Sequence, residues 1–198
     1  LHVRSRRQRQ MCIRDRPKVL VKILVFTILA CLMNLLTTLL IDFNDVLINQ
    51  VGLSPTEAEQ ALSITRVASV IGTFIVSWFL LAIFFLITWV ITKIFKSNVS
   101  AKVVFASLLR YSIIMASVSC VVLFIQWLFH IDPSIVSIDS LNIFAPKNKW
   151  LGAISLRNII TAWFFGIMLH SSFRISQKWS WIGALAVFIV LFVFSGLA

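Results

Sequence analysis

The side chains that most often carry out chemistry are few in this chain and lie far apart. Cys31 and Cys120 each fall in the middle of an apolar run, and His130 and His170 are expected at opposite faces of the membrane. Neither the HExxH nor the CxxC spacing of a metal site occurs. A nucleophile elbow and a phosphate-binding loop are also missing from the sequence. These residue types therefore predict no catalytic residue, no metal site and no cofactor.

Polar side chains do recur at helical spacing within or beside the apolar runs. The candidate positions are Asn34, Thr37 and Thr38 in the first run, Ser69, Thr73 and Ser77 in the second, Arg110 beside the third and Asn158 in the fourth. Small polar residues at this spacing allow helices to approach each other closely in lipid. Alternatively, they would line a path for a substrate. The interiors of the runs hold no carboxylate, which argues against a proton-coupled transporter.

The composition places these residues in a membrane. The chain has 198 residues, of which 60% are hydrophobic and 13% are charged. A soluble domain is usually about 45–50% apolar and about 25% charged. A small domain leaves much of its surface in water and cannot bury such an excess. An integral membrane protein whose apolar surface faces the lipid bilayer is therefore predicted.

The first sixteen residues are predicted not to be native. The segment 1–16 contains six arginines and one aspartate, so it supplies +5 of the formal charge of +11. In one reading frame it corresponds to a transposase sequencing adapter with its barcode. The alternative is a basic arm. Because a non-native segment says nothing about function, the charge does not predict nucleic-acid binding, and residues 1–16 are expected to pack against nothing.

The remaining residues, 17–198, are predicted to form a single all-α membrane domain, a polytopic helical bundle. A span needs about 20 apolar residues. The five predicted spans cover about 20–42, 67–94, 111–129, 156–173 and 181–198. Strands of a β-barrel would alternate in polarity, and these runs do not. Before the second run, Ser54, Pro55 and Glu57 form the pattern of a helix start, with Ser54 as the N-cap.

The distribution of lysine and arginine predicts the orientation. The side expected in the cytoplasm carries Lys18, Lys22, Lys93, Lys96, Lys102, Arg174 and Lys178. The opposite side carries Arg66, Lys147, Lys149 and Arg157, and all the acidic residues of 17–198. The N-terminus is therefore predicted in the cytoplasm and the C-terminus outside it.

Arg110 is expected at or near the cytoplasmic interface, since a lone charge in mid-membrane is costly. Two routes lead there. In one, residues 99–109 lie along the interface and the third span starts at Tyr111. In the other, a single tilted helix lets Arg110 reach the headgroups. Contact of Arg110 with Asn34 or Asn158 inside the bundle would instead favour a transporter.

Three stretches resemble the Yip family, membrane proteins named for binding Ypt/Rab GTPases. They read LSPTEAEQALSITRVASVIGTFIVSWFLLAIFFLITWVITKIF, SNVSAKVVFASLLRYSIIMAS and SLNIFAPKNKWLGAISLRNIITAWFFGIMLHSSFRISQKWSWIGAL. The first resembles the acidic outer segment and long second span of the family. The second resembles its short turn before the third span, and the last resembles its final hairpin.

The resemblance implies a helical bundle without enzymatic chemistry, which acts by binding other membrane components. Eukaryotic members act in vesicle trafficking through GTPase partners and oligomerisation. The short N-terminus is more similar to prokaryotic members, so a bacterial cytoplasmic membrane is expected, with a second copy or other membrane proteins as partners. The alternative is a small transporter or a transporter subunit. A water-filled path lined by Asn34, Thr37, Gln126 or Asn158 would favour that alternative.

Overall fold

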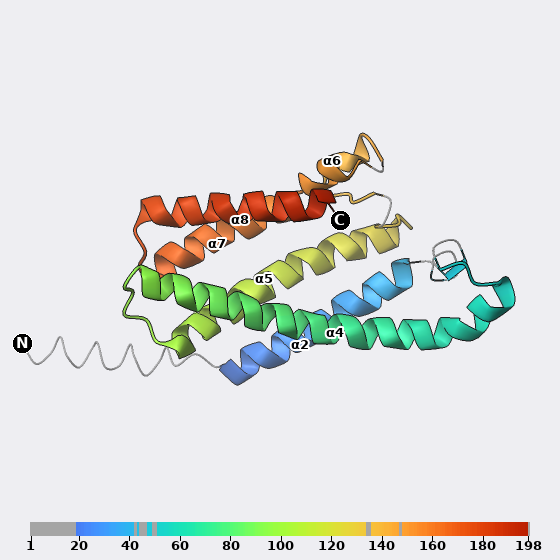
Figure 1. Ribbon diagram of the computed structural model, residues 1–198, viewed down its shortest axis with the longest axis horizontal. Helices are drawn as coiled ribbons and strands as arrows, with labels where there is room; N and C mark the ends of the chain where they lie inside the picture. The colour runs from blue at the N-terminus through green and yellow to red at the C-terminus, as the bar shows by residue number, and fades with distance from the viewer. Residues whose placement is uncertain are drawn as a thin grey trace, which may run out of the picture.

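The computed structural model describes residues 19–41, 43, 47–48, 51–133, 136–146 and 148–197. Its elements in chain order are α2 (Val19–Leu40), α4 (Pro55–Ile94), α5 (Ala101–Leu128), η2 (Leu141–Ile143), α6 (Lys149–Ala153), α7 (Leu156–Phe173) and α8 (Gln177–Leu197). The long helices run side by side and alternate in direction, so the connecting segments gather at two ends (Figure 1). The described part is all-helical, apart from one isolated antiparallel bridge between Ser140 and Ser155.

Four of the described helices, α2, α4, α5 and α8, are long and apolar enough to cross a membrane. The helix α7 has the bounds predicted for the fourth span, Leu156–Phe173. Its 18 residues extend about 27 Å at 1.5 Å per residue. Arg157, Asn158 and His170 make it more polar than the other four. The five helices of the sequence prediction are therefore present, and four of them meet the criteria for a span.

The helix α4 starts earlier than the apolar run that it contains. It begins at Pro55 rather than at residue 67, and its 40 residues extend about 60 Å. The predicted helix start is confirmed, because the backbone N–H of Ser54 donates to the Glu57 carboxylate at 3.0 Å. The Ser54 hydroxyl in turn accepts from the Glu57 N–H, which completes a capping box. The residues after this cap include Glu57, Glu59 and Gln60, so the helix starts with a polar segment before its apolar region.

The helix α5 is continuous through Arg110. It runs from Ala101 to Leu128, so the separate interfacial segment 99–109 considered from the sequence does not form. No glycine or proline lies in this stretch to bend it. The second route, a single helix with an outward-pointing Arg110, agrees with this geometry, and Arg110 is exposed. Its depth in a membrane stays a prediction.

The core lies toward the end of the bundle that carries the turns 95–100 and 174–176. Val104, Leu108 and Leu109 of α5 are completely buried there. The rings of Phe84 and Phe165, from α4 and α7, pack with their centroids 5.4 Å apart. These contacts fix α4, α5 and α7 against one another.

Glycines bring α7 and α8 close together. A Cβ atom added to Gly166 would lie 2.9 Å from the Ala184 Cβ and 3.3 Å from the backbone oxygen of Ser180. A Cβ on Gly183 would lie 2.7 Å from the Leu169 side chain. Such small residues allow helices to pack closely without a polar contact. The two helices therefore form a tight antiparallel hairpin (Figure 1).

The opposite end of α7 is held by the loop that precedes it. The backbone N–H of Leu156 donates to the Asp139 carbonyl at 2.6 Å. The Asp139 carboxylate accepts the Arg157 N–H at 3.3 Å and lies 3.7 Å from the Arg157 side chain. A carboxylate at a helix N-terminus satisfies free N–H groups and the helix dipole. Asp139 therefore fixes where α7 begins.

Candidate functional site

Polar residues of four helices line a cavity of about 350 Å³ inside the bundle. Its walls are formed by Phe26, Ala30, Met33, Asn34 and Thr37 of α2, Thr73 and Ser77 of α4, Tyr111, Ser112, Met115, Ala116 and Ser119 of α5, and Thr161 of α7. Four of the residues singled out from the sequence meet here: Asn34, Thr37, Thr73 and Ser77. This intramembrane cavity is the candidate site that the predicted polar positions build.

Three hydroxyl groups of the cavity are bonded to their own helices. Thr37 donates to the Met33 carbonyl at 2.9 Å, and Ser77 donates to the Thr73 carbonyl at 2.7 Å. Thr73 itself donates to the Ser69 carbonyl at 2.6 Å. Such bonds are usual for serine and threonine within a helix. They use the donors of these three hydroxyls and leave their oxygen lone pairs as possible acceptors.

Asn34 differs from these three residues. Its side chain is only 6% exposed, and its amide nitrogen has no hydrogen-bond partner within the described part of the chain. A buried N–H group without an acceptor is uncommon, because it has lost its bonds to water without replacement. The cavity lining therefore includes an amide donor without a partner, next to several hydroxyl oxygens.

Tyr111 joins the cavity to α7. Its hydroxyl donates to the Thr161 carbonyl at 3.1 Å, and its ring packs beside Phe84 and Phe165. The Thr161 hydroxyl contacts the Met115 sulfur at 3.2 Å. Tyr111 and Thr161 were not among the predicted positions. Their place depends on how α5 and α7 cross, which the spacing within one helix does not report.

The other predicted positions lie away from the cavity walls. Thr38 donates to the Asn34 carbonyl, and Ser69 donates to the Arg66 carbonyl, so both bond within their own helices. Asn158 donates to the Ala153 carbonyl at 2.9 Å, near the start of α7. Arg110 points outward and contacts neither Asn34 nor Asn158.

Gln126 also has a structural partner. Its side chain is completely enclosed and donates to the Val136 carbonyl at 2.9 Å. This bond ties the end of α5 to the following loop. Of the four residues whose alignment along a path would favour a transporter, Asn34 and Thr37 line the cavity described above.

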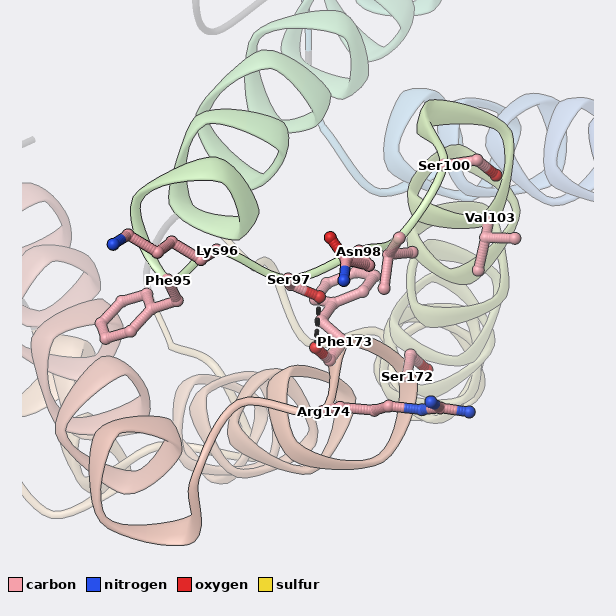
Figure 2. Close-up of a pocket in the computed structure, with 10 residues that line it drawn as sticks. Phe95, Lys96, Ser97, Asn98, Ser100, Val103, Ser172, Phe173 and Arg174 are labelled. Atoms are coloured by element: carbon pink, nitrogen blue, oxygen red, sulfur yellow. Dashed lines mark hydrogen bonds between the residues drawn. The ribbon is translucent and has the colours of Figure 1, made fainter.

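A second cavity, of about 550 Å³, lies between the turns 95–100 and 172–174 (Figure 2). The Ser97 hydroxyl donates to the Phe173 carbonyl at 2.6 Å and joins the two turns. Lys96 and Arg174 point in opposite directions away from this bond (Figure 2). Because their charges do not converge, this cavity does not present a site where both would hold one anion.

Within the described part of the chain, no group of three histidine, cysteine or acidic residues could hold a metal ion. The ring nitrogen Nδ1 of His170 lies 2.9 Å from the Ile175 carbonyl, which places this histidine in the turn between α7 and α8. Cys120 is buried against α2, where its sulfur lies 3.8 Å from the Leu29 carbonyl.

Long apolar helices, polar side chains gathered between them and outward-facing apolar side chains define a multi-pass α-helical membrane protein. The family model of the Yip1 domain matches residues 4–197, so the chain belongs to the Yip1 family. The resemblance seen in the sequence is thereby confirmed. No curated protein and no solved structure matches the chain significantly. The family match starts within residues 1–16, which lie outside the described residues, and the origin of that segment stays a prediction.

Proposed function

We propose that this protein is a non-enzymatic, five-span protein of a bacterial cytoplasmic membrane that acts by binding other membrane components. In this proposal the N-terminus is cytoplasmic and the C-terminus lies outside. The end that carries Lys93, Lys96, Lys102, Arg174 and Lys178 is the cytoplasmic one, in keeping with the positive-inside rule. In addition to α2, α4, α5 and α8, the helix α7 also crosses the membrane in this proposal. It packs against α8 and α5.

The exposure of α4 is the observation that best supports a binding role. Only 6% of its most apolar stretch is buried, against 39% for α5. Ile71, Ile75 and Phe79 are each more than half exposed along this helix. Exposed apolar surface of this extent marks a region that lipid or another membrane protein covers. The first turns of α4, before this surface, reach beyond the ends of the other long helices (Figure 1).

Photo-crosslinking in native membranes tests whether α4 contacts a partner. A benzophenone amino acid would replace Ile75 or Phe79, which are 60% and 63% exposed. The matched control is Leu185 of α8, also 60% exposed. We expect α4 to form adducts of defined mass with another membrane protein or a second copy, and Leu185 to label lipid only. Lipid adducts alone at all three positions would contradict the proposed role of α4.

Transport is the second candidate function, because of the cavity around Asn34. Its free amide donor and the surrounding acceptor oxygens are groups that could bind a small polar solute. A transport route requires water to reach this cavity from at least one side of the membrane.

Cysteine accessibility tests this second candidate. Ser112 would be replaced by cysteine in a chain in which alanine replaces the other cysteines. If the cavity belongs to a transport route, a charged thiol reagent added in water should modify Ser112→Cys. The control is Leu185→Cys, which faces outward and should stay unmodified. Protection of Ser112→Cys from both sides of the membrane would rule out an aqueous route through this cavity.

A further inference from the structure

Two positive side chains meet on the seam between α2 and α5. The Lys22 ammonium donates to the Ala106 carbonyl at 3.2 Å. In a continuous α-helix the same carbonyl accepts the N–H of the residue four positions later, which is Arg110. The ammonium of Lys22 therefore stands beside the Arg110 backbone, and the two charges lie within electrostatic range of each other.

Within the described residues, neither charge has an anionic partner. The described carboxylates are Glu57, Glu59, Asp132 and Asp139, and they lie at the opposite end of the bundle (Figure 1). Arg110 is exposed, and the described part of the chain supplies its side chain with no ion pair. Like charges side by side on an apolar helix surface are unfavourable unless an anion lies between them.

An apolar groove lies farther along the same seam. It has a volume of about 520 Å³ and is lined by Leu32, Leu36 and Leu39 of α2 and by Cys120, Val121, Phe124 and Trp127 of α5. Val121 follows Arg110 by about three helical turns and Leu36 follows Lys22 by about four, so each pair shares a helix face. Val121 lies about 16 Å from Arg110 along the axis of α5.

That distance matches the depth of one leaflet. The hydrocarbon core is about 30 Å thick, so an acyl chain extends about 15 Å below its headgroup. We propose that the seam binds one anionic phospholipid, with its phosphate between Lys22 and Arg110 and the end of an acyl chain in the groove. Arg110 would supply a planar fork of N–H donors and Lys22 a compact charge. Cationic sites between spans favour anionic headgroups in this way.

This site uses no residue of α4, so its failure and the failure of the proposed role of α4 are separate results. The test is native mass spectrometry and thermal unfolding of the full chain in detergent with added phosphatidylglycerol. Phosphatidylcholine, which carries no net charge, is the comparison lipid. In a separate measurement, inorganic phosphate replaces the lipid, to test whether free phosphate alone binds. We expect phosphatidylglycerol alone to bind and to raise the unfolding temperature.

Four variants distinguish this site from general attraction to charge. Lys22→Gln and Arg110→Gln should each weaken phosphatidylglycerol binding about tenfold, since each removes a charge-assisted hydrogen bond. Lys178→Gln removes one charge at the same end of the bundle and should change binding by less than about twofold. Val121→Trp fills the groove and should weaken binding while both charges stay. Circular dichroism of each variant without lipid verifies that it is folded.

Equal binding of phosphatidylglycerol and phosphatidylcholine would overturn the proposal. So would a loss of phosphatidylglycerol binding in Lys178→Gln as large as the loss in Lys22→Gln or Arg110→Gln. An equal rise in unfolding temperature with inorganic phosphate alone would also overturn it, because the site would then recognise free phosphate. Unchanged binding by Val121→Trp would remove the groove from the site.

Discussion

At the scale of single residues, two buried polar side chains differ in whether they have hydrogen-bond partners. One is Asp139 in the loop before α7, and the other is Asn34 in the cavity. Asp139 is 4% exposed in its side chain and is surrounded by donors from Arg157 and Ser137. Asn34 is equally enclosed, yet its amide nitrogen has no acceptor. A satisfied buried group holds a structure in place, whereas an unsatisfied one destabilises it and is free to bind.

Replacing Asn34 should raise stability. Leucine has a similar shape and no donor to leave unpaired, so Asn34→Leu should stabilise the fold by about 1–3 kcal/mol. Thermal unfolding in detergent measures the change. Thr37→Val is the control, because its hydroxyl already bonds to the Met33 carbonyl. A lower unfolding temperature for Asn34→Leu would show that the amide has a stabilising partner.

Removing Asp139 should have the opposite effect. Asp139→Ala leaves the side chain and the backbone N–H of Arg157 without their carboxylate acceptor, so a loss of about 1–3 kcal/mol is expected. Hydrogen exchange of the Arg157 amide should become faster. The control Glu59→Ala removes an exposed carboxylate at the same end of the bundle. Slow exchange that persists in Asp139→Ala would show that the start of α7 has other support.

At the scale of helices, the hydropathy of the sequence locates the apolar part of each helix. It does not locate the residue at which each helix begins. The bounds of α7 agree with the prediction because Ser155 caps its start and Arg174 adopts a left-handed conformation at its end. By contrast, α4 and α5 begin before their apolar runs. Glu57, Arg66 and Lys102 are too polar for a membrane interior, but they are compatible with a helix.

The candidate site could be predicted only in part, because the sequence reports the face of each helix but not how the helices cross. The side chains of Asn34, Thr37, Thr73 and Ser77 recur at the helical period, so their shared faces are readable from each helix alone. Thr161 and Tyr111 enter the cavity through contacts between helices. Those contacts depend on crossing geometry and on which faces pack together.

The glycines provide a prediction at this scale. Gly166→Ala places a methyl group 2.9 Å from the Ala184 Cβ and should destabilise the α7–α8 hairpin by about 1–3 kcal/mol. A Cβ on Gly72 of α4 meets nothing within 4 Å, so Gly72→Ala should stabilise that helix by up to about 1 kcal/mol. Thermal unfolding of the two variants should therefore shift in opposite directions. A shift in the same direction would contradict the close packing of α7 and α8.

At the scale of the whole molecule, the alternating helices place the basic turns at one end and the described acidic residues at the other (Figure 1). The proposed topology makes the basic end cytoplasmic. A membrane-impermeant thiol reagent added outside cells should modify Glu59→Cys and Phe144→Cys. It should spare Asn98→Cys and Gln177→Cys until the membrane is opened. Alanine replaces the other cysteines in each variant. The inverse labelling pattern would reverse the orientation.

The tight pairing of α7 with α8 has a consequence for biosynthesis. If α7 crosses the membrane, Arg157, Asn158 and His170 make its partition from the translocon into lipid unfavourable as a single segment. The glycine contacts with α8 and the short turn between the two helices would let them enter the bilayer together as a preassembled unit. Ribosomes stalled before α8 has emerged should therefore leave α7 extractable by alkaline carbonate, and stalling after α8 should make it resistant.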